Sequence, residues 1–147
     1  MIFETKSADE TKSVGYKIAE KLYTGGVRSA YIAMRGEMGV GKTAFTAGFA
    51  SYFGISGVKS PTYAVMNRHT AKSGVRIYHF DMYRIESEDD LYSVGYDECL
   101  DEGGYVIVEW SENIDYAIPP DAIFVEIARC EEDESARLIT VKGGDFQ

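Results

Sequence analysis

A glycine-rich segment between an apolar run and a helical pattern constrains the fold of this chain more than any other feature. Residues 36–43, with the sequence GEMGVGKT, match the pattern G-x-x-x-x-G-K-[ST]. The apolar run 29–34 before this segment predicts a strand that is buried on both faces, and residues 43–53 predict a helix. A strand, a glycine-rich loop and a helix in this order form the context that a phosphate-binding loop requires.

The residues of this segment have the chemistry that a nucleotide polyphosphate needs. Glycines let successive backbone N–H groups turn inward around phosphate oxygens, and the positive end of the following helix attracts anions. Lys42 can reach the β- and γ-phosphate oxygens, and Thr43 can offer its hydroxyl to Mg²⁺. We therefore expect a phosphate and magnesium site made of Glu37, Met38, Gly39, Val40, Gly41, Lys42 and Thr43. The alternative is a tight strand-to-helix turn that carries a surface lysine.

A carboxylate at the end of a second apolar run is the candidate magnesium ligand. Glu109 directly follows the run 105–108, which predicts a buried strand. A carboxylate at a buried strand end is costly unless it pairs with a cation, and Mg²⁺ bound to one hydroxyl and two phosphates needs such a ligand. We expect Thr43 and Glu109 to hold the metal. A solvated charge at a strand exit is the alternative.

Two further candidates for a hydrolytic role lie between the loop and Glu109. Asp81 ends the apolar run 77–80, where it could orient a water, reach the metal shell or accept a proton. Thr62 lies in a Ser-Pro-Thr-Tyr segment after the loop helix, where nucleotide switches often carry a hydroxyl that senses the γ-phosphate. The same segment could equally be a turn. His79 is interpreted as a core or supporting imidazole rather than a catalytic base.

The rest of the chain alternates between strand and helix patterns. Residues 1–5 predict a strand, and Ser7 with Glu10 forms a capping box for a helix whose apolar face carries Val14, Ile18, Ala19 and Leu22. Further patterns predict hairpins of 63–70 with 75–80 and of 122–130 with 137–142, and short helices at 87–91 and 96–100. We therefore expect one α/β domain over residues 1–147, with a P-loop NTPase-like fold: a central, mostly parallel sheet, antiparallel hairpin additions and helices on both faces.

Charge and apolar pattern exclude several classes of function. With 24 acidic and 15 basic residues the formal net charge is −9, which disfavours autonomous binding of nucleic acid. No apolar stretch approaches the roughly 18 residues of a membrane span, and the N-terminal residues show no export signal. Cys99 and Cys130 are too few for a disulfide scaffold and are not spaced as metal ligands. We expect a cytoplasmic protein with free thiols and no membrane association.

Four segments together resemble the TsaE family of bacterial ATPases. They are residues 36–43, 58–63 (VKSPTY), 78–84 (YHFDMYR) and 108–110 (VEW). The match spans nearly the whole chain, and the Ser-Pro-Thr-Tyr and His-Phe-Asp-x-Tyr-Arg elements are far more specific than the glycine-rich loop alone. The resemblance implies a role in making N6-threonylcarbamoyladenosine at position 37 of tRNAs that read codons beginning with A.

The same resemblance implies cofactors, partners and residue roles. TsaE-like proteins associate with the TsaD and TsaB proteins, and their hydrolysis of ATP is thought to reset that complex. ATP and Mg²⁺ are the implied cofactors, and tRNA would be contacted only through the partners. By position, Asp81 and Thr62 would serve hydrolysis and switching, and Thr11 and Arg137 would lie near the nucleotide. Trp110 resembles the family's tryptophan beside the metal carboxylate. There it would stack, or report on whether nucleotide is bound.

Rival functions share the glycine-rich loop. A small nucleotide kinase would need an acceptor pocket and usually an arginine-rich lid, but the arginines of this chain are scattered. A GTPase would need a base reader of the Asn-Lys-x-Asp type, which the sequence lacks. A third possibility is an assembly module with negligible turnover, in which bound ATP only shapes a partner surface. Stimulation of hydrolysis by a partner distinguishes the ATPase from this module.

Overall fold

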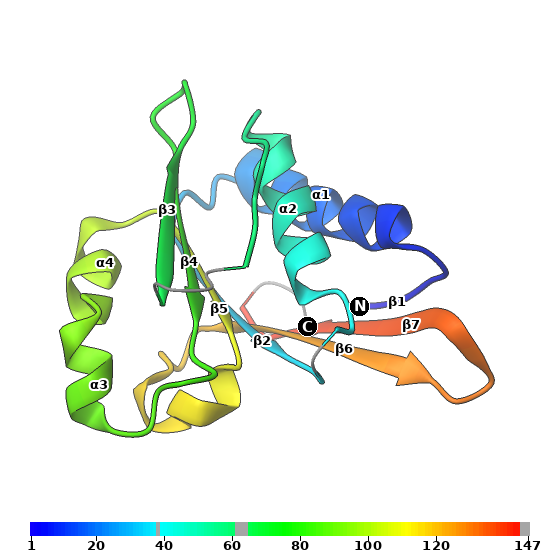
Figure 1. Cartoon of the computed structure of the whole chain (residues 1–147). Coiled ribbons are helices and arrows are strands. Elements are labelled where there is room, and N and C mark those ends of the chain that lie inside the picture. Colours follow the sequence, from blue (N-terminus) through cyan, green and yellow to red (C-terminus); the bar gives the residue numbers. More distant parts are fainter. Residues whose placement is uncertain (38, 61–64, 145–147) are drawn as a thin grey trace.

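The computed structural model describes residues 1–37, 39–60 and 65–144, which build one seven-stranded sheet with helices against it (Figure 1). The strand order is β1-β7-β6-β2-β5-β4-β3. The strands are β1 (Ile2–Thr5), β2 (Ala30–Arg35), β3 (Met66–Thr70), β4 (Arg76–Asp81), β5 (Tyr105–Glu109), β6 (Ile123–Cys130) and β7 (Asp133–Lys142). The helices are α1 (Ala8–Thr24), α2 (Lys42–Tyr52), α3 (Glu88–Ser93), α4 (Tyr96–Glu102) and the 3₁₀ helix η1 (Ser111–Ala117).

The centre of the sheet is parallel and its two edges are antiparallel. β2 pairs in parallel with β5 and β6, and β5 pairs in parallel with β4. At one edge, β3 pairs antiparallel with β4. At the other edge, β7 pairs antiparallel with β6, and β1 pairs antiparallel with β7. The expected α/β fold with a parallel centre and antiparallel hairpin additions is therefore confirmed. Because parallel strands end at the same edge, the last residues of β2, β4 and β5 meet there.

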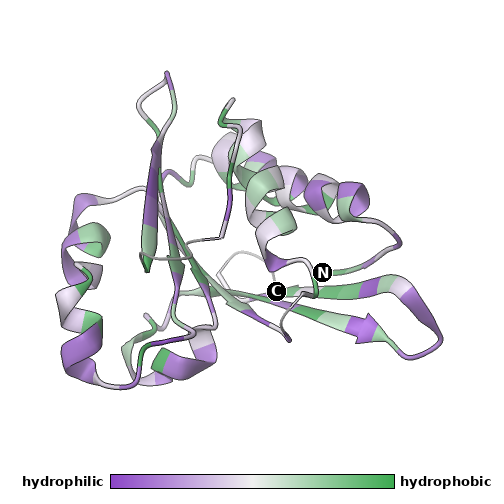
Figure 2. Ribbon diagram, viewed as in Figure 1, coloured by the Kyte–Doolittle hydropathy of each residue, from purple (hydrophilic) through white to green (hydrophobic). Residues whose placement is uncertain are grey.

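The first helix forms as its sequence pattern predicts. The Ser7 hydroxyl accepts a hydrogen bond from the Glu10 backbone N–H at 3.1 Å, and the Glu10 carboxylate accepts one from the Lys6 N–H at 3.2 Å. The first contact satisfies an N–H group that the first turn would leave unpaired, and the second holds the backbone of the residue before the N-cap rather than the N-cap N–H of a complete capping box. The predicted apolar face is buried, and Figure 2 shows hydrophilic and hydrophobic residues alternating along α1. None of the helices in the described parts of the chain is long and apolar enough to cross a membrane.

The two faces of the sheet carry separate hydrophobic clusters. α1 and α2 cover one face with Ile18, Phe45 and Phe49, which pack on the strands below them. Chain segments 85–100 and 114–118, with α3, α4 and η1, cover the other face over Phe80 and Val108. Helices thus lie on both faces, as expected. The α1–α2 contact is especially close, because a Cβ added at Gly48 would lie 1.9 Å from the Lys12 carbonyl oxygen.

Most predicted elements end within one or two residues of their observed bounds, and the larger differences concern β7, η1 and β3. β7 begins at Asp133 rather than 137, because Asp133, in a segment that looks like an acidic turn in sequence, still pairs with Cys130 of β6 across a shift in register. η1 was not predicted, since a short 3₁₀ stretch has no helical periodicity to recognise. β3 begins at Met66, whereas the start of its predicted hairpin strand, at 63, lies outside the described residues.

Candidate nucleotide and metal site

The glycine-rich loop joins β2 to α2 with a backbone that its glycines make possible. Gly39 and Gly41 have φ values of 77° and 116°, a region in which other residues are strained. Gly41 is also the N-cap of α2, and no side chain caps this end of the helix. The first N–H groups of α2 are therefore available to an anion. This geometry fits the predicted phosphate site, although the roles of the loop residues stay predictions.

Lys42 is folded back over the loop. Its Nζ donates a hydrogen bond to the Gly36 carbonyl at 2.6 Å and lies 4.0 Å from the centre of the Trp110 ring. Burial lowers the pKa of Lys42, while the negative charges of Glu109 and neighbouring acids act in the opposite direction. An ammonium with so few partners in a desolvated position would gain from phosphate oxygens.

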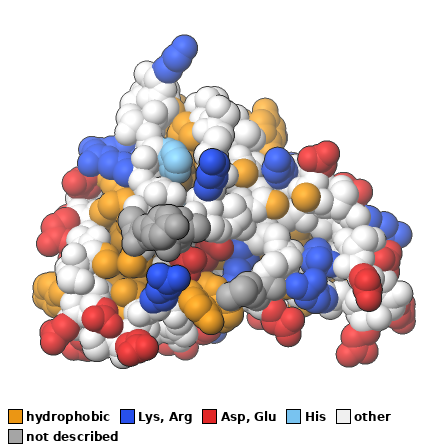
Figure 3. All heavy atoms as spheres, viewed as in Figure 1, with side chains coloured by type: hydrophobic (Ala, Val, Ile, Leu, Met, Phe, Trp, Pro, Cys, Tyr) orange, Lys and Arg blue, Asp and Glu red, His pale blue; other side chains and the backbone are white. Residues whose placement is uncertain are grey.

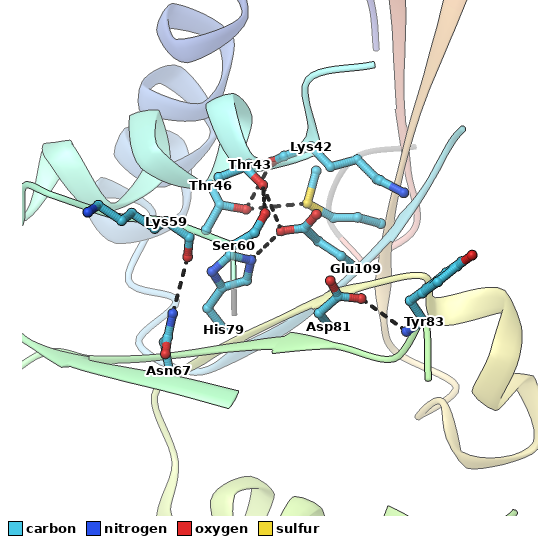
Figure 4. A network of polar contacts seen from close by, with 11 residues as sticks. Lys42, Thr43, Thr46, Lys59, Ser60, Asn67, His79, Asp81, Tyr83 and Glu109 are labelled. Atoms are coloured by element: carbon cyan, nitrogen blue, oxygen red, sulfur yellow. Dashed lines mark hydrogen bonds and ion pairs between the residues drawn. The ribbon is translucent and has the colours of Figure 1, made fainter. Parts of the chain in front are cut away.

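Glu109 lies beside Thr43, as the metal prediction requires. The Thr43 hydroxyl donates to Glu109 Oε2 at 3.3 Å, although these residues are 66 positions apart in the chain. The Thr43 hydroxyl also contacts the Ser60 hydroxyl at 2.5 Å, and Glu109 Oε2 contacts His79 Nε2 (Figure 4). Since an ionised carboxylate only accepts hydrogen bonds, Thr43 donates to Glu109 and Ser60 donates to Thr43. Ser60 is thus a direct hydrogen-bond partner of Thr43. From the sequence, only Thr62 of the same Ser-Pro-Thr-Tyr segment is a candidate for the site.

The donor set fits Mg²⁺ bound together with nucleotide rather than a protein-only metal site. Among the described residues, no group of three or more His, Cys, Asp or Glu side chains could hold a metal. A hydroxyl and a single carboxylate, as Thr43 and Glu109 provide, suit a cation whose remaining ligands are water and phosphate oxygens. The affinity for Mg²⁺ would therefore depend on bound nucleotide.

Asp81 lies next to Glu109 but forms no hydrogen bond with Thr43. The register of β4 and β5 pairs Asp81 with Glu109, and Asp81 Oδ1 accepts a hydrogen bond from the Tyr83 N–H at 3.0 Å. Burial raises the pKa of Asp81, and this Tyr83 N–H opposes the rise. Its carboxylate is half-buried and lies on the same side of the site as Glu109 (Figure 4). The position is compatible with any of the three roles predicted for it.

The two residues expected to lie near the nucleotide both approach the loop. Arg137, from β7, donates from Nε to the Val40 carbonyl at 3.0 Å. The Thr11 methyl carbon lies 3.5 Å from where a Cβ on Gly41 would be, and its hydroxyl pairs with that of Thr5 at 2.9 Å. The structure therefore brings both ends of the sequence to the loop.

Other predicted residues do not join the cluster of side chains. The Glu37 side chain is 82% exposed and forms an ion pair with Arg129, so only its backbone can serve the loop. Met38 and Thr62 lie outside the described residues. Trp110 is placed by the only positive φ of a non-glycine residue in the described chain, 58°, and its ring contacts that of Tyr83.

The surroundings of the loop are mostly acidic. A cavity of about 960 Å³ adjoins Gly36, and its lining includes two arginines, Arg35 and Arg129, and five acids: Glu37, Glu112, Glu126, Glu131 and Glu134. Figure 3 shows acidic side chains gathered at both sides of the viewed face, over α3 and α4 and over the β6–β7 tip, with basic side chains nearer its middle. Phosphate groups are therefore better placed on the loop amides and Lys42 than deep in this cavity.

A family model and individual relatives of known family match this chain, and they agree on one family. The family model described as "Threonylcarbamoyl adenosine biosynthesis protein TsaE" matches residues 5–139. The tRNA threonylcarbamoyladenosine biosynthesis protein TsaE of Bacillus subtilis (strain 168) is 32% identical over 147 residues, covering 99% of this chain and 88% of its own length. The protein of the same name from Haemophilus influenzae is 33% identical, covering 85% of this chain and 80% of its own length.

A solved structure has the same architecture. The crystal structure of Bacillus subtilis YdiB aligns with a TM-score of 0.77 and 25% identity, covering 97% of this chain and 84% of that one. The family model covers most of the chain, including the glycine-rich loop, Asp81 and Glu109. The chain therefore belongs to the TsaE family of threonylcarbamoyl adenosine biosynthesis proteins.

Proposed function

We propose that this chain is a Mg²⁺-dependent ATPase domain, spanning residues 1–147, that acts in N6-threonylcarbamoyladenosine modification of tRNA at adenosine 37. The observation that carries the proposal is the meeting of Thr43 and Glu109, 3.3 Å apart, at the uncapped start of α2. A hydroxyl, a carboxylate, a lysine and free loop amides at one point are the groups that phosphoryl transfer to water uses.

Each group has a defined task in the proposed reaction. Lys42 and the loop N–H groups bind the phosphates, and their positive charge stabilises the negative charge that develops on the γ-phosphate oxygens. Thr43 and Glu109 would hold Mg²⁺, which would neutralise part of the negative charge of the phosphates. Asp81, beside Glu109 in the sheet, orients the attacking water. Arg137 and Thr11 hold the loop from the side of β7 and α1.

Partners complete the proposed function. The net charge of −9 disfavours direct contact with tRNA, so we assign tRNA binding to the TsaD and TsaB proteins and expect the cytoplasm as the place of action. In the structure the Thr43 hydroxyl is shared between Ser60 and Glu109. We propose that partner binding repositions Ser60 and Asp81 around Thr43 and Glu109 and thereby raises a low intrinsic turnover.

The test is release of phosphate from ATP with Mg²⁺, by the chain alone and with purified TsaD and TsaB, with GTP as the parallel substrate. Strong stimulation by the two partners that is selective for ATP is the expected result. Unchanged turnover together with nucleotide-dependent complex formation would instead support the assembly module. If neither stimulation nor a nucleotide-dependent complex is seen, the role in tRNA modification is wrong. Transfer of phosphate to a nucleoside monophosphate would identify a kinase.

A further inference from the structure

His79 is a polar exception within a buried strand. β4 is buried over Ile77, Tyr78 and Phe80, and the His79 side chain itself is fully buried. The strand register pairs His79 with Ile107, so Glu109 is its diagonal neighbour on the same face of the sheet. His79 Nε2 contacts Glu109 Oε2 from this position (Figure 4). Among the described residues, the polar contact of this imidazole is therefore with the proposed magnesium ligand.

The hydrogen bonds of Glu109 fall on one of its two oxygens. Both His79 and Thr43 contact Oε2, and because the carboxylate only accepts, the Nε2 atom of His79 carries the hydrogen. The described residues donate no hydrogen bond to Oε1. Two donors on Oε2 fix the rotation of the carboxylate group and, among the described residues, leave Oε1 without a donor. A carboxylate fixed in this way is preorganised for a cation at its open side.

Packing alone does not explain an imidazole at this position. The His79 Nδ1 atom is buried and has no hydrogen-bond partner among the described residues, which carries a desolvation cost that an apolar side chain would avoid. The apolar neighbours on its face, Ile77 and Ile107, would pack equally well against a Leu or Met. What an apolar residue would lack is the donor to Glu109.

We infer that His79 is a positioning residue for the magnesium carboxylate: it fixes Glu109 through Oε2 and leaves Oε1 available to Mg²⁺, and thereby sets the affinity for Mg²⁺ rather than for the nucleotide. The inference rests on the proposed function, since it assumes that Glu109 holds Mg²⁺. It concerns a residue that does not touch substrate or metal, and its effect is transmitted through one hydrogen bond. Loss of such supporting partners typically lowers metal affinity by about 10- to 100-fold.

Two substitutions of similar polarity separate the hydrogen bond from the side chain's bulk. The amide nitrogen of glutamine lies as many bonds from Cα as the Nε2 atom of histidine, whereas that of asparagine is one bond nearer. His79→Gln can therefore keep the donor to Glu109, and His79→Asn loses it. Calorimetry would first measure the affinity for ADP in EDTA. A series of Mg²⁺ concentrations would then show how far Mg²⁺ raises this affinity, and the Mg²⁺ concentration that gives half of the rise is the quantity to compare. The thermal midpoint of each variant would show whether the variant is folded.

We expect His79→Asn to raise the half-saturating Mg²⁺ concentration by about 10- to 100-fold, with ADP affinity in EDTA unchanged, and His79→Gln to restore most of the loss. In a Glu109→Gln background, His79→Asn should have little further effect on Mg²⁺, because the oxygen it orients no longer carries charge. An unchanged Mg²⁺ requirement in folded His79→Asn would overturn the inference. Absence of any Mg²⁺ effect in the parent chain would instead remove the metal site of the proposed function.

A measurement on the parent chain covers the case in which His79→Asn does not fold. The chain has 2 histidines, so ring ¹⁵N spectra of the parent and of His69→Asn assign the His79 resonances. We expect a proton on Nε2, and a shift of that resonance when Mg²⁺ is added to the ADP-bound chain. An Nε2 without a proton, or spectra identical with and without Mg²⁺, would contradict the proposed contact.

Discussion

Replacing Gly48 by alanine tests the close contact of α1 and α2, on which the position of Thr11 beside the loop depends. An added Cβ would lie 1.9 Å from the oxygen, 2.6 Å from the carbon and 2.7 Å from the Cα of Lys12. All three are backbone atoms of α1, so no side-chain rotation relieves the clash. The helices must separate, or one of them must bend.

The size of the effect follows from two opposing terms. Overpacking of a close contact costs about 1–3 kcal/mol, and a clash with backbone belongs at the upper end of this range. Alanine in place of glycine in a helix returns about 1 kcal/mol. The net loss is therefore about 2 kcal/mol, which lowers the Tm of a domain of this size by about 4–8 °C. Separation of α1 also moves Thr11 from Gly41, so ADP affinity should fall.

Thermal unfolding followed by circular dichroism measures the loss. Ser13→Ala is the matched control, because Ser13 is exposed on α1 and changes within about 0.5 kcal/mol are usual for such positions. A Gly48→Ala variant with the Tm of the parent would refute the reasoning, since alanine could then be accommodated only if the helices were farther apart than the structure has them.

Three further predictions concern Lys42, Trp110 and the buried tyrosines. Lys42→Ala should lower ADP affinity by about 30-fold or more, because the bound phosphates lose a buried cationic partner, whereas an unchanged dissociation constant in calorimetry would contradict its placement. Trp110 is the sole tryptophan and lies 4.0 Å from Lys42 Nζ, so nucleotide that draws Lys42 away should change its fluorescence, and Lys42→Ala should remove most of the change. Burial raises the pKa of Tyr96 and Tyr105 to about 12. The tyrosine hydroxyls of the unfolded chain lose their protons near pH 10, whereas those of the folded chain keep them to about pH 12. The free energy of unfolding should therefore fall as the pH rises from about 10 to about 12. Equal urea midpoints at these two pH values would contradict this prediction.

The local parts of the site were predictable from sequence. The loop at 36–43 requires particular residues at fixed spacing, and the apolar run before Glu109 marks a strand end, so both could be recognised without knowledge of the fold. The buried stripe of α1 follows the helical period in the same way. Their meeting point follows from the parallel pairing of β2 with β5.

The contacts that depend on tertiary placement could not be derived from spacing. Arg137 reaches Val40 because β7 folds back beside β6, and no local pattern encodes a contact across 97 residues. The direct hydrogen bond of Ser60 with Thr43 depends on how the chain returns after α2. His79 reads as a core residue because its neighbours are apolar, and only the strand register shows that it lies diagonal to Glu109. The contacts of polar residues inside buried strands are thus the hardest to predict from sequence.

The most direct test of the central claim compares Glu109→Gln with the parent in release of phosphate from Mg²⁺–ATP, with TsaD and TsaB both present. Glutamine keeps the shape and the acceptor oxygen that Thr43 contacts and removes the charge that holds the metal. We predict that ADP affinity in EDTA stays near that of the parent. Loss of a residue that only supports a metal ligand typically lowers metal affinity or activity by roughly 10- to 100-fold. Loss of the ligand charge itself should lower turnover by more than this. A variant that hydrolyses ATP like the parent would contradict the assignment of Glu109 to the metal, and with it the account of how this site works.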